Sequence, residues 1–319
     1  MSEAALDLWD DALSAHDEAT LFHTRCWARF VTGIFPRLED RSREIEHRGM
    51  TRHLPLFAWR RAGGLLTTLH SSFPFLYGGP IPAAGIEATD AARLAGLGGH
   101  SLRWTTNPFA APEASHPAEA PNGRVERTPD ATHLLELPAT EAQYWDEVLS
   151  TGKRNDVRRL GKKGVVIEES RAPEDVDAVY ALYLASFARW GGRPRFVYPP
   201  EFYRGLVSEL GGVTRFTVAR HEGRLLGGAF TLRAFDKVHY LAGYFDPEER
   251  TLRPNVLLQI ESIQAAIRAG ARWYDFLPSG GHASVEEFKE GLGGQRVQFE
   301  IWETRGALHA LLERFRAKG

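Results

Sequence analysis

The chain has 319 residues, of which 43% are hydrophobic, so it is long enough for two packed cores of ordinary size. A net charge of −2 argues against a dedicated nucleic-acid-packaging or membrane-surface protein, and a single cysteine, Cys26, excludes a disulfide framework and a cysteine-rich zinc site. The acidic start lacks the features of a secretory signal, and no apolar run is long enough to span a membrane, so the expected location is the cytoplasm.

The first half of the chain mixes short helices with strands. Apolar patterning and turn residues predict helices at 6–16, 24–34 and 87–97 and strands at 52–60, 65–69, 101–105 and 132–137. Gly63 and Gly64 separate two of these strands and permit a tight hairpin turn. Residues 107–123 lack periodicity and predict a surface loop. We place a domain boundary near Pro138, which gives domains of residues 1–138 and 139–319.

The second half is more regular. We expect helices at 140–149, 153–163, 174–190, 201–210, 256–269, 284–290 and 308–315, and strands at 165–169, 213–220, 225–233, 238–244, 273–277 and 298–303. An antiparallel meander followed by a helical crossover predicts a mixed sheet with helices on both faces, so the expected fold class is α+β. Asn255 is the predicted N-cap of one helix, and Ser284 with Glu287 a predicted capping box of another.

The first candidate site combines a strand with the start of the next long helix. Gly227 and Gly228 lie inside a predicted strand, where a glycine pair favours a β-bulge. Such a bulge separates the neighbouring strands and lets the backbone of a ligand approach. The N–H groups at the start of the 256–269 helix, with Arg253 and Asn255 beside them, form an anion site. We therefore predict cofactor binding at these four residues. The alternative is a glycine pair needed for packing and an ordinary capped helix.

The second candidate site is the Gly-rich turn at 278–281 that follows a predicted strand. Polar groups at the end of a strand commonly face the ligand crevice of such a sheet, so Asp275 can orient or deprotonate an amine. Lys289, close behind, can stabilise a developing oxyanion. Ser279 in the turn, and Tyr240 and Tyr244 on the 238–244 strand, are expected to contact the substrate. The alternative is a structural turn with a solvated lysine.

The third candidate is the basic helix at 153–163. Arg154, Arg158 and Lys162 share one helical face at a spacing of four and can hold the phosphates of a nucleotide or of tRNA, although such a row is often only a solvated face. The fourth is an aromatic segment that either lines a cleft or belongs to the core, comprising Phe73, Phe75 and Tyr77. Phosphate-loop, zinc-helix and nucleophile-elbow motifs are absent, and the histidines show no ligand spacing, so no metal site is expected.

A series of short motifs runs through most of the chain. They are LPL at 54–56, SFPFLYGG at 72–79, KRN at 153–155, RR at 158–159, KKG at 162–164, FARW at 187–190, LGG at 226–228, RPN at 253–255, YDF at 274–276 and FK at 288–289. In this order and spacing, from roughly residue 20 to 303, they resemble the FemAB-like branch of the GNAT acyltransferase superfamily.

The resemblance implies two GNAT-like domains in tandem, each a mixed, mostly antiparallel sheet flanked by helices, with the second domain catalytic. It also implies that Phe288 and Lys289 lie at the acyl-transfer centre, that Arg154 and Arg158 handle phosphates, and that no metal is used. The coiled-coil arm of some tRNA-dependent members is missing. The loop that cradles the coenzyme A pyrophosphate in standard GNAT enzymes is also absent, and residues 252–256 stand in its place.

The function that follows is N-acyl transfer from an activated donor to an amine. The expected donors are an acyl-CoA or an aminoacyl-tRNA, bound as substrates rather than as tightly held cofactors, which makes tRNA a candidate partner. The acceptor is expected to be a small-molecule amine or a peptidoglycan precursor. The alternative is a non-catalytic GNAT-like scaffold that binds a nucleotide or an RNA ligand. The oligomeric state is not indicated.

Overall fold

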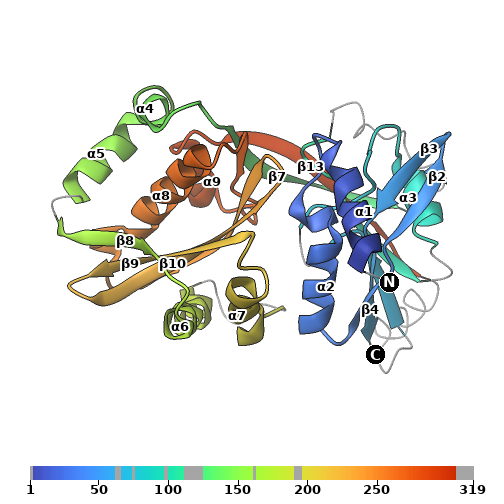
Figure 1. Ribbon diagram of the computed structural model, residues 1–319, viewed down its shortest axis with the longest axis horizontal. Helices are drawn as coiled ribbons and strands as arrows, with labels where there is room; N and C mark the ends of the chain where they lie inside the picture. The colour runs from blue at the N-terminus through green and yellow to red at the C-terminus, as the bar shows by residue number, and fades with distance from the viewer. Residues whose placement is uncertain are drawn as a thin grey trace, which may run out of the picture. The chain divides into compact units, whose positions relative to one another are not determined.

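The structure is a computed structural model that describes residues 3–61, 66–73, 76–96, 100–110, 125–160, 163–189 and 196–306 (Figure 1). The chain divides into two compact units: the first comprises residues up to Ala131 and those from Val297, and the second Thr132–Arg296. This division differs from the expected one, which assigned all residues after 138 to the second domain. The reason is the last strand, β13 (Gln295–Thr304), whose residues Ile301–Thr304 pair with β6 (Ser101–Thr105) of the first unit.

The first unit is built on a sheet of order β1-β4-β5-β6-β13. Its other strands are β1 (Leu38–Asp40), β4 (Phe57–Arg61) and β5 (Leu66–His70), and all neighbours are antiparallel except β5 and β6. A separate pair consists of β2 (Arg43–His47) and β3 (Met50–Leu54). The predicted hairpin is confirmed by the β4–β5 pairing. The predicted strand at 52–60 is wrong, because the chain breaks at Pro55, which lacks the N–H that a continuous ladder needs.

The α-helices in the described part of this unit are α1 (Glu3–Ser14), α2 (Arg25–Ile34) and α3 (Ala88–Leu94), and a 3-10 turn at Leu21–His23 precedes α2. The core contains Trp104 stacked on Trp302, with ring centroids 6.4 Å apart. Phe73 and Tyr77 are buried, so the core interpretation holds for these two aromatic residues.

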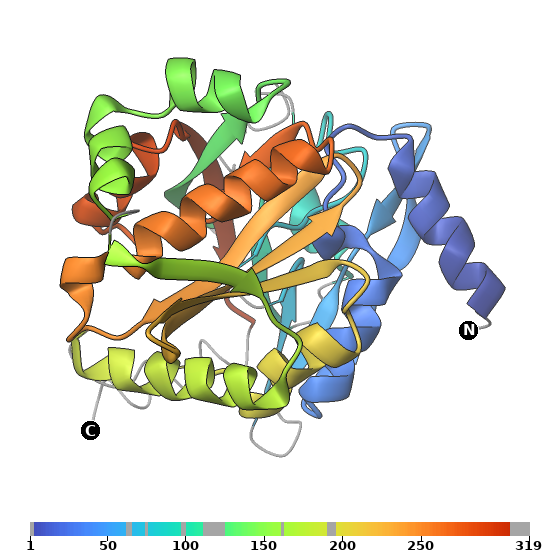
Figure 2. The same cartoon turned by 60° about the vertical axis from the view of Figure 1, so that its left-hand side comes forward.

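The second unit has a sheet of order β7-β12-β11-β10-β9-β8. These strands are β7 (Glu126–Glu136), β8 (Val165–Glu169), β9 (Thr214–His221), β10 (Arg224–Ala234), β11 (Lys237–Phe245) and β12 (Trp273–Asp275). Only β11 and β12 are parallel among the described pairs of this sheet. Figure 2 shows α8 (Pro254–Arg268) on one face and α6 (Pro173–Arg189) on the other. The expected mixed, mostly antiparallel sheet with helices on both faces is confirmed.

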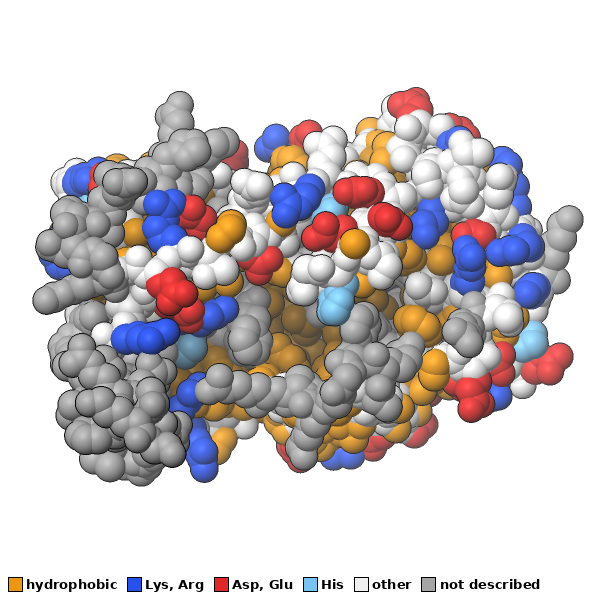
Figure 3. Space-filling model, turned by 180° about the vertical axis from the view of Figure 1, so that it is seen from behind, with side chains coloured by type: hydrophobic (Ala, Val, Ile, Leu, Met, Phe, Trp, Pro, Cys, Tyr) orange, Lys and Arg blue, Asp and Glu red, His pale blue; other side chains and the backbone are white. Residues whose placement is uncertain are grey.

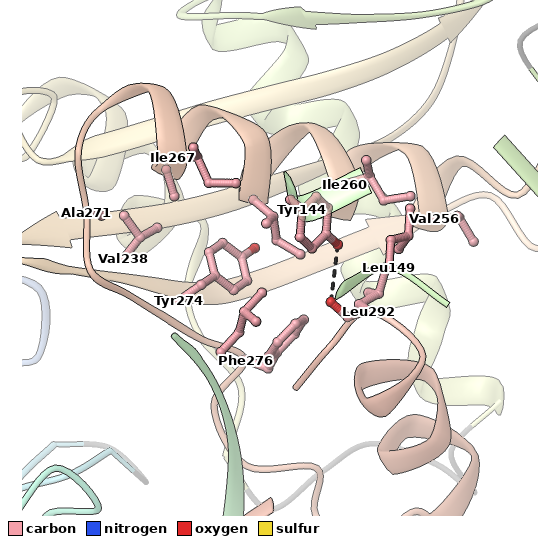
Figure 4. Close-up of a cluster of buried hydrophobic side chains, with 13 residues drawn as sticks. Tyr144, Leu149, Val238, Val256, Ile260, Ile267, Ala271, Tyr274, Phe276 and Leu292 are labelled. Atoms are coloured by element: carbon pink, nitrogen blue, oxygen red, sulfur yellow. Dashed lines mark hydrogen bonds between the residues drawn. The ribbon is translucent and has the colours of Figure 1, made fainter. Parts of the chain in front are cut away.

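The remaining helices of this unit are α4 (Glu141–Gln143), which continues into a π-helical turn at Tyr144–Val148, α5 (Thr151–Leu160), α7 (Pro200–Ser208) and α9 (Ala283–Glu290). Its core lies between α8 and the sheet, where Val256 and Ile260 of α8 pack with Tyr274 and Phe276 (Figure 4). Tyr144 reaches into this cluster and donates a hydrogen bond to the carbonyl of Leu292 at 3.2 Å, which ties the turn after α9 to the π-helical turn.

Both predicted helix caps are wrong. α8 begins two residues earlier than expected, with Pro254 as its first residue and Arg253 as its N-cap, so Asn255 lies inside the first turn. Proline is favoured at that first position because its missing N–H would have no partner there anyway. α9 is preceded by His282 as N-cap, so Ser284 lies inside the helix rather than at the head of a capping box.

Several expectations lie outside the described residues. They concern the hairpin turn at 63–64, Phe75, most of the 107–123 loop, Lys162, Trp190 and the helix at 308–315. Within the described ranges, no helix has the length and apolar character required to cross a membrane.

Histidines whose pKa is lowered by burial make stability depend on pH, among them His70 and His133. Burial lowers the pKa of His70 to about 3 and also lowers that of His133. In the unfolded chain both protonate below about pH 6.5, so in that range the unfolded state binds more protons and stability falls as the pH falls. We expect His70 alone to reduce the unfolding free energy by about 2 kcal/mol at pH 5 relative to pH 7.5. Urea titrations at both pH values measure the unfolding free energy. In His70→Gln, the part of the pH dependence that comes from His70 should disappear. An equal pH dependence in His70→Gln and the parent would contradict this prediction.

Candidate functional site

A pocket of about 1000 Å³ opens beside the start of α8. Its lining comes from α5, the segment just before β8, the end of β11, the turn before α8 and the helices α8 and α9: Lys153, Arg159, Lys163, Phe245, Thr251, Arg253, Asn255, Val256, Ser284, Glu287 and Phe288. Among these described residues, four are cationic and one is acidic. On the face in Figure 3, described basic and acidic side chains are interspersed, in keeping with the near-neutral net charge, so the excess of cations at the pocket is a local feature.

Arg253, the N-cap of α8, places its guanidinium beside the N-terminus of that helix. Its backbone is left-handed, with φ of 41°, and its side chain forms an ion pair with Asp156 of α5. Asp156 also accepts a hydrogen bond from Arg159 at 3.0 Å, so one carboxylate orients two guanidinium groups at the pocket. The positive end of the α8 dipole adds to this potential. The arrangement is suited to an anionic ligand such as a phosphate.

Lys153 supplies a second kind of contact. Its ammonium lies 4.2 Å from the centroid of the Phe288 ring, a cation–π arrangement across the pocket. Burial lowers the pKa of Lys153, and the charge of Arg253 acts in the same direction while Asp156 opposes it. A Cβ at Gly291 would lie 3.1 Å from Cε of Lys153, so a glycine there leaves room for the side chain. Lys153 was not among the predicted site residues, although it opens the KRN motif.

Arg154 and Arg158 lie on a different face of α5. Arg154 donates to the carbonyls of Trp145 and Asp146 at 2.9 and 2.7 Å, and the guanidinium of Arg158 lies 5.9 Å from the Trp145 ring. Both therefore secure the preceding π-helical turn and are not among the described residues that line the pocket. A helix turns about 100° per residue, so residues at a spacing of four lie on one helical face. Arg154 and Arg158 of the predicted basic row lie on a face that does not line the pocket.

The glycine pair of β10 is closely packed on both sides. A register shift between Leu225 and Gly227 confirms the expected bulge. A Cβ at Gly227 would lie 2.5 Å from the carbonyl oxygen of Tyr244, and one at Gly228 would lie 2.7 Å from Cγ2 of Val179. Both glycines pair with β11 and β9, so the strands are not splayed there. The strands are therefore not separated as expected at Gly227 and Gly228, and close packing accounts for both glycines; the cofactor contact expected of them stays a prediction.

This packing yields a test of the glycine assignment. Gly227→Ala is expected to lower the unfolding free energy by about 1–3 kcal/mol, because the new methyl group meets backbone rather than a movable side chain. Gly152→Ala is the matched control: it lies in α5 with no atom within 4 Å of its Cβ position, and alanine is the better helix former. Urea unfolding of both variants measures the difference. Unchanged stability in Gly227→Ala would restore the view that an open gap lies beside the strand.

Tyr240 and Tyr244 are also turned away from the pocket. The Tyr240 hydroxyl lies 1.7 Å from the Cβ position of Gly243, so a side chain at 243 would require the Tyr240 ring to move, and that ring packs against the core of the unit. The Tyr244 hydroxyl lies 2.8 Å from that of Tyr203. Burial raises the pKa of both phenols above the usual value, so they stay protonated. The substrate contacts predicted for them stay predictions.

The predicted catalytic residues meet in one buried network. Nζ of Lys289 donates to the carbonyl of Leu277 at 2.5 Å and to Oγ of Ser279 at 2.8 Å. Asp275 is completely buried, and its carboxylate accepts from Thr132 Oγ1 at 2.9 Å and from His239 Nδ1 at 2.8 Å. Lys289 is buried as well, which excludes the solvated-lysine alternative. Phe288 lines the pocket while the next residue, Lys289, enters the network, so α9 connects the two.

The expectation that Asp275 removes a proton from an amine does not fit this geometry. A carboxylate with no exposed surface has no path to a bound amine in this arrangement. Within the described ranges, no group of three or more His, Cys, Asp or Glu side chains is placed to hold a metal ion.

Comparison with known families identifies one domain in the chain. Residues 151–290 match the family model described as an acetyltransferase (GNAT) domain. This segment contains α5, α8, α9 and all the residues that line the pocket. No curated protein matches the chain.

Solved structures share the fold over nearly the whole length. The crystal structure of FemX has a TM-score of 0.64 at 14% identity and covers 92% of this chain and 95% of its own. A C-terminal domain of a putative lysylphosphatidylglycerol synthetase from Agrobacterium fabrum has a TM-score of 0.54 at 11% identity, covering 96% of both chains. A tandem GNAT protein from the clavulanic acid biosynthesis pathway has a TM-score of 0.52 at 16% identity, covering 95% and 94%. At these identities the likeness establishes the fold, and it confirms the resemblance that the motifs indicated.

Proposed function

Because residues 151–290 form a domain of the acetyltransferase (GNAT) family, in a chain with the FemX fold, we propose that the protein is an N-acyltransferase. It moves an acyl or aminoacyl group from an activated donor to an amine, and its working site lies in the second unit. The donor is an acyl-CoA or an aminoacyl-tRNA, and the acceptor is a small-molecule amine or a peptidoglycan precursor. The resemblance of the motifs to the FemAB-like branch supports the last of these acceptors.

The observation that carries the proposal is the cationic pocket at the start of α8. Both candidate donors carry phosphate groups: those of an acyl-CoA are separated from the thioester by the pantetheine arm, and those of an aminoacyl-tRNA lie nearer to the terminal ester. Arg159, Lys163 and Arg253 bind such phosphates as charge-assisted donors, and the start of α8 adds its dipole. The Phe288 ring forms an apolar wall on the same pocket. A pocket with both features fits a phosphorylated donor whose acyl end is directed toward α9.

The reaction depends more on the alignment of the two substrates than on the activation of either one. The amine nitrogen forms a bond to the donor carbonyl carbon, the bond to the thiolate or ribose oxygen breaks, and the amine loses a proton. Holding both substrates in line supplies much of the rate. We assign the stabilisation of the developing oxyanion to the charge of Lys289. Its ammonium is bonded to protein groups and does not line the pocket, so it acts electrostatically from beside Phe288 rather than by contact, and its desolvation strengthens that effect. Asp275 is enclosed and proton transfer needs contact, so water removes the proton of the amine.

A second candidate function rests on the same burial. Lys289 and Asp275 are both engaged with protein groups, whereas the cationic pocket stands apart from them. That separation favours a scaffold that binds a nucleotide or RNA without transferring anything. Salt-sensitive binding without product would identify this case.

The experiment that separates the two functions is a transfer assay. The protein is incubated with an isotopically labelled acyl-CoA or aminoacyl-tRNA and a set of amine acceptors, and products are examined by mass spectrometry. N-acyl transfer predicts an amide together with free thiol or uncharged tRNA, formed only when acceptor is present. Donor binding that gives no amide with any acceptor would support the scaffold instead.

A further inference from the structure

Leu277 adopts a backbone conformation that its side chain disfavours. Its φ is +56°, in the left-handed region, and the residue is buried. For an L-residue this conformation brings Cβ close to a carbonyl oxygen, and outside glycine it occurs mainly for Asn and Asp. A buried leucine therefore stays in this conformation only where neighbouring groups hold it.

The group that holds Leu277 is the carboxylate of Asp275. The Leu277 N–H donates to Oδ1 of Asp275 at 2.9 Å. Thr132 of β7 donates to the same oxygen, and His239 of β11 donates to Oδ2. Since β7 and β11 lie on either side of β12, the carboxylate is fixed from both neighbouring strands. Its orientation is set before the chain turns at Leu277.

The left-handed turn has a direct consequence for Lys289. It presents the Leu277 carbonyl to the Lys289 ammonium at 2.5 Å, beside the Ser279 hydroxyl. In an extended or right-handed conformation the Leu277 carbonyl would point in another direction. The contacts thus run from Asp275 through the Leu277 backbone to Nζ of Lys289.

We propose that Asp275 is a positioning residue: by holding Leu277 in the left-handed conformation, it places the carbonyl that fixes the ammonium of Lys289. The importance of this position for catalysis rests on the proposed function, but the positioning itself does not. It replaces the role of base that the sequence suggested for Asp275, and it gives His239 and Thr132 the task of orienting the carboxylate.

The test measures how well Lys289 is held, without any substrate. The folded protein is treated briefly with acetic anhydride, and acetylation of Lys289 is measured by mass spectrometry relative to the exposed Lys163. We expect Lys289 to be protected in the parent protein. In Asp275→Ala, which removes the oxygen that accepts from the Leu277 N–H, its relative labelling should rise about tenfold, because an L-residue loses roughly that factor in population when the left-handed conformation is no longer held. Unchanged labelling in a folded Asp275→Ala variant would overturn the proposal.

A matched pair at position 277 separates positioning from a general loosening of the fold. Leu277→Ala and Leu277→Gly remove the same side chain, but only glycine adopts a positive φ without cost. Combined with Asp275→Ala, the Leu277→Ala variant should show the full rise in labelling, and the Leu277→Gly variant should keep Lys289 protected within about twofold, since the left-handed conformation then needs no support. An equal rise in both would mean that Asp275 acts by another route.

Two further comparisons keep the outcomes distinct. If Asp275→Ala does not fold by itself, we expect Leu277→Gly to restore folding to it and Leu277→Ala not to, and equal failure of both would contradict the proposal. Where transfer is detectable, Asp275→Ala should lower kcat with little change in KM, and the glycine substitution should restore it. Restored protection of Lys289 in a protein that transfers nothing would uphold the positioning and reject the proposed function.

Discussion

Lys289→Met is expected to lower the rate of acyl transfer at least about tenfold. Methionine keeps the length and the apolar stem of the side chain but cannot stabilise an oxyanion. Removing one preorganised donor from a transition state commonly costs this much or more, because the interaction forms in a site from which water is excluded. Burial of Lys289 places its ammonium in such an environment. The effect should appear in kcat rather than in KM, because the charge on the carbonyl oxygen develops only during the reaction.

Lys237→Met is the matched control for this experiment. Lys237 is also buried in the second unit, and its ammonium forms an ion pair with Asp236 at 2.5 Å. It lies at the start of β11, and it is not among the residues that line the pocket. Its replacement should change stability but leave the rate per folded molecule near that of the parent. An unchanged rate in Lys289→Met would remove Lys289 from the mechanism, and an equal fall in both variants would attribute the loss to folding.

Arg159→Gln and Arg158→Gln are expected to have opposite outcomes despite being neighbours in sequence. Arg159 lines the pocket, whereas Arg158 lies against Trp145. Loss of one charge-assisted contact to a phosphate costs about 1.5–3 kcal/mol, so Arg159→Gln should weaken donor binding about tenfold or more. Arg253→Gln should act similarly at the start of α8. Arg158→Gln should leave the donor affinity within about twofold of the parent.

Titration of donor binding over a range of salt concentrations measures both the donor affinity and its dependence on salt. Each phosphate contact that is lost should also reduce the slope of log affinity against log salt by about one for a nucleic-acid donor. Arg159→Gln is expected to show this reduction and Arg158→Gln to retain the parent slope. The opposite ranking would mean that the basic row predicted from the sequence, with Arg154 and Arg158, faces the donor after all.

Most elements could be predicted from the sequence because their signals are local. The strands at 101–105 and 165–169 have the predicted bounds, since each is a short apolar run between turn residues. The meander of β9, β10 and β11 was predicted within one residue at each end because Gly223 and Asp236 mark its turns. The strands β1 and β2 were missed. Both are short and partly exposed, and they carry charged residues that give no strand signal.

The candidate site was harder to predict because it depends on how each element is rotated. In α5, the basic residues by themselves do not indicate which face of the helix points toward the core. Leu160 is buried and Val157 packs against the core, and these two apolar positions fix which face turns inward. Lys153 lies four residues before Val157 and seven before Leu160, so helical periodicity places Lys153 on the face of these two residues and Arg154 on another. The positive φ of Leu277 was not expected, because leucine rarely adopts it and because the Asp275 carboxylate that accepts from its N–H is oriented by Thr132, far away in the chain.

The central claim is that the pocket beside α8 binds an activated acyl donor, and the melting temperature measured with each donor tests it most directly. The protein is heated with a coenzyme A thioester, with a charged tRNA and with neither. At a hundredfold excess over Kd, a bound donor stabilises the folded state by about 2.7 kcal/mol, so a clear rise in melting temperature is expected with at least one of them. That rise should shrink in Arg253→Gln. A melting temperature that changes with neither donor would contradict the account.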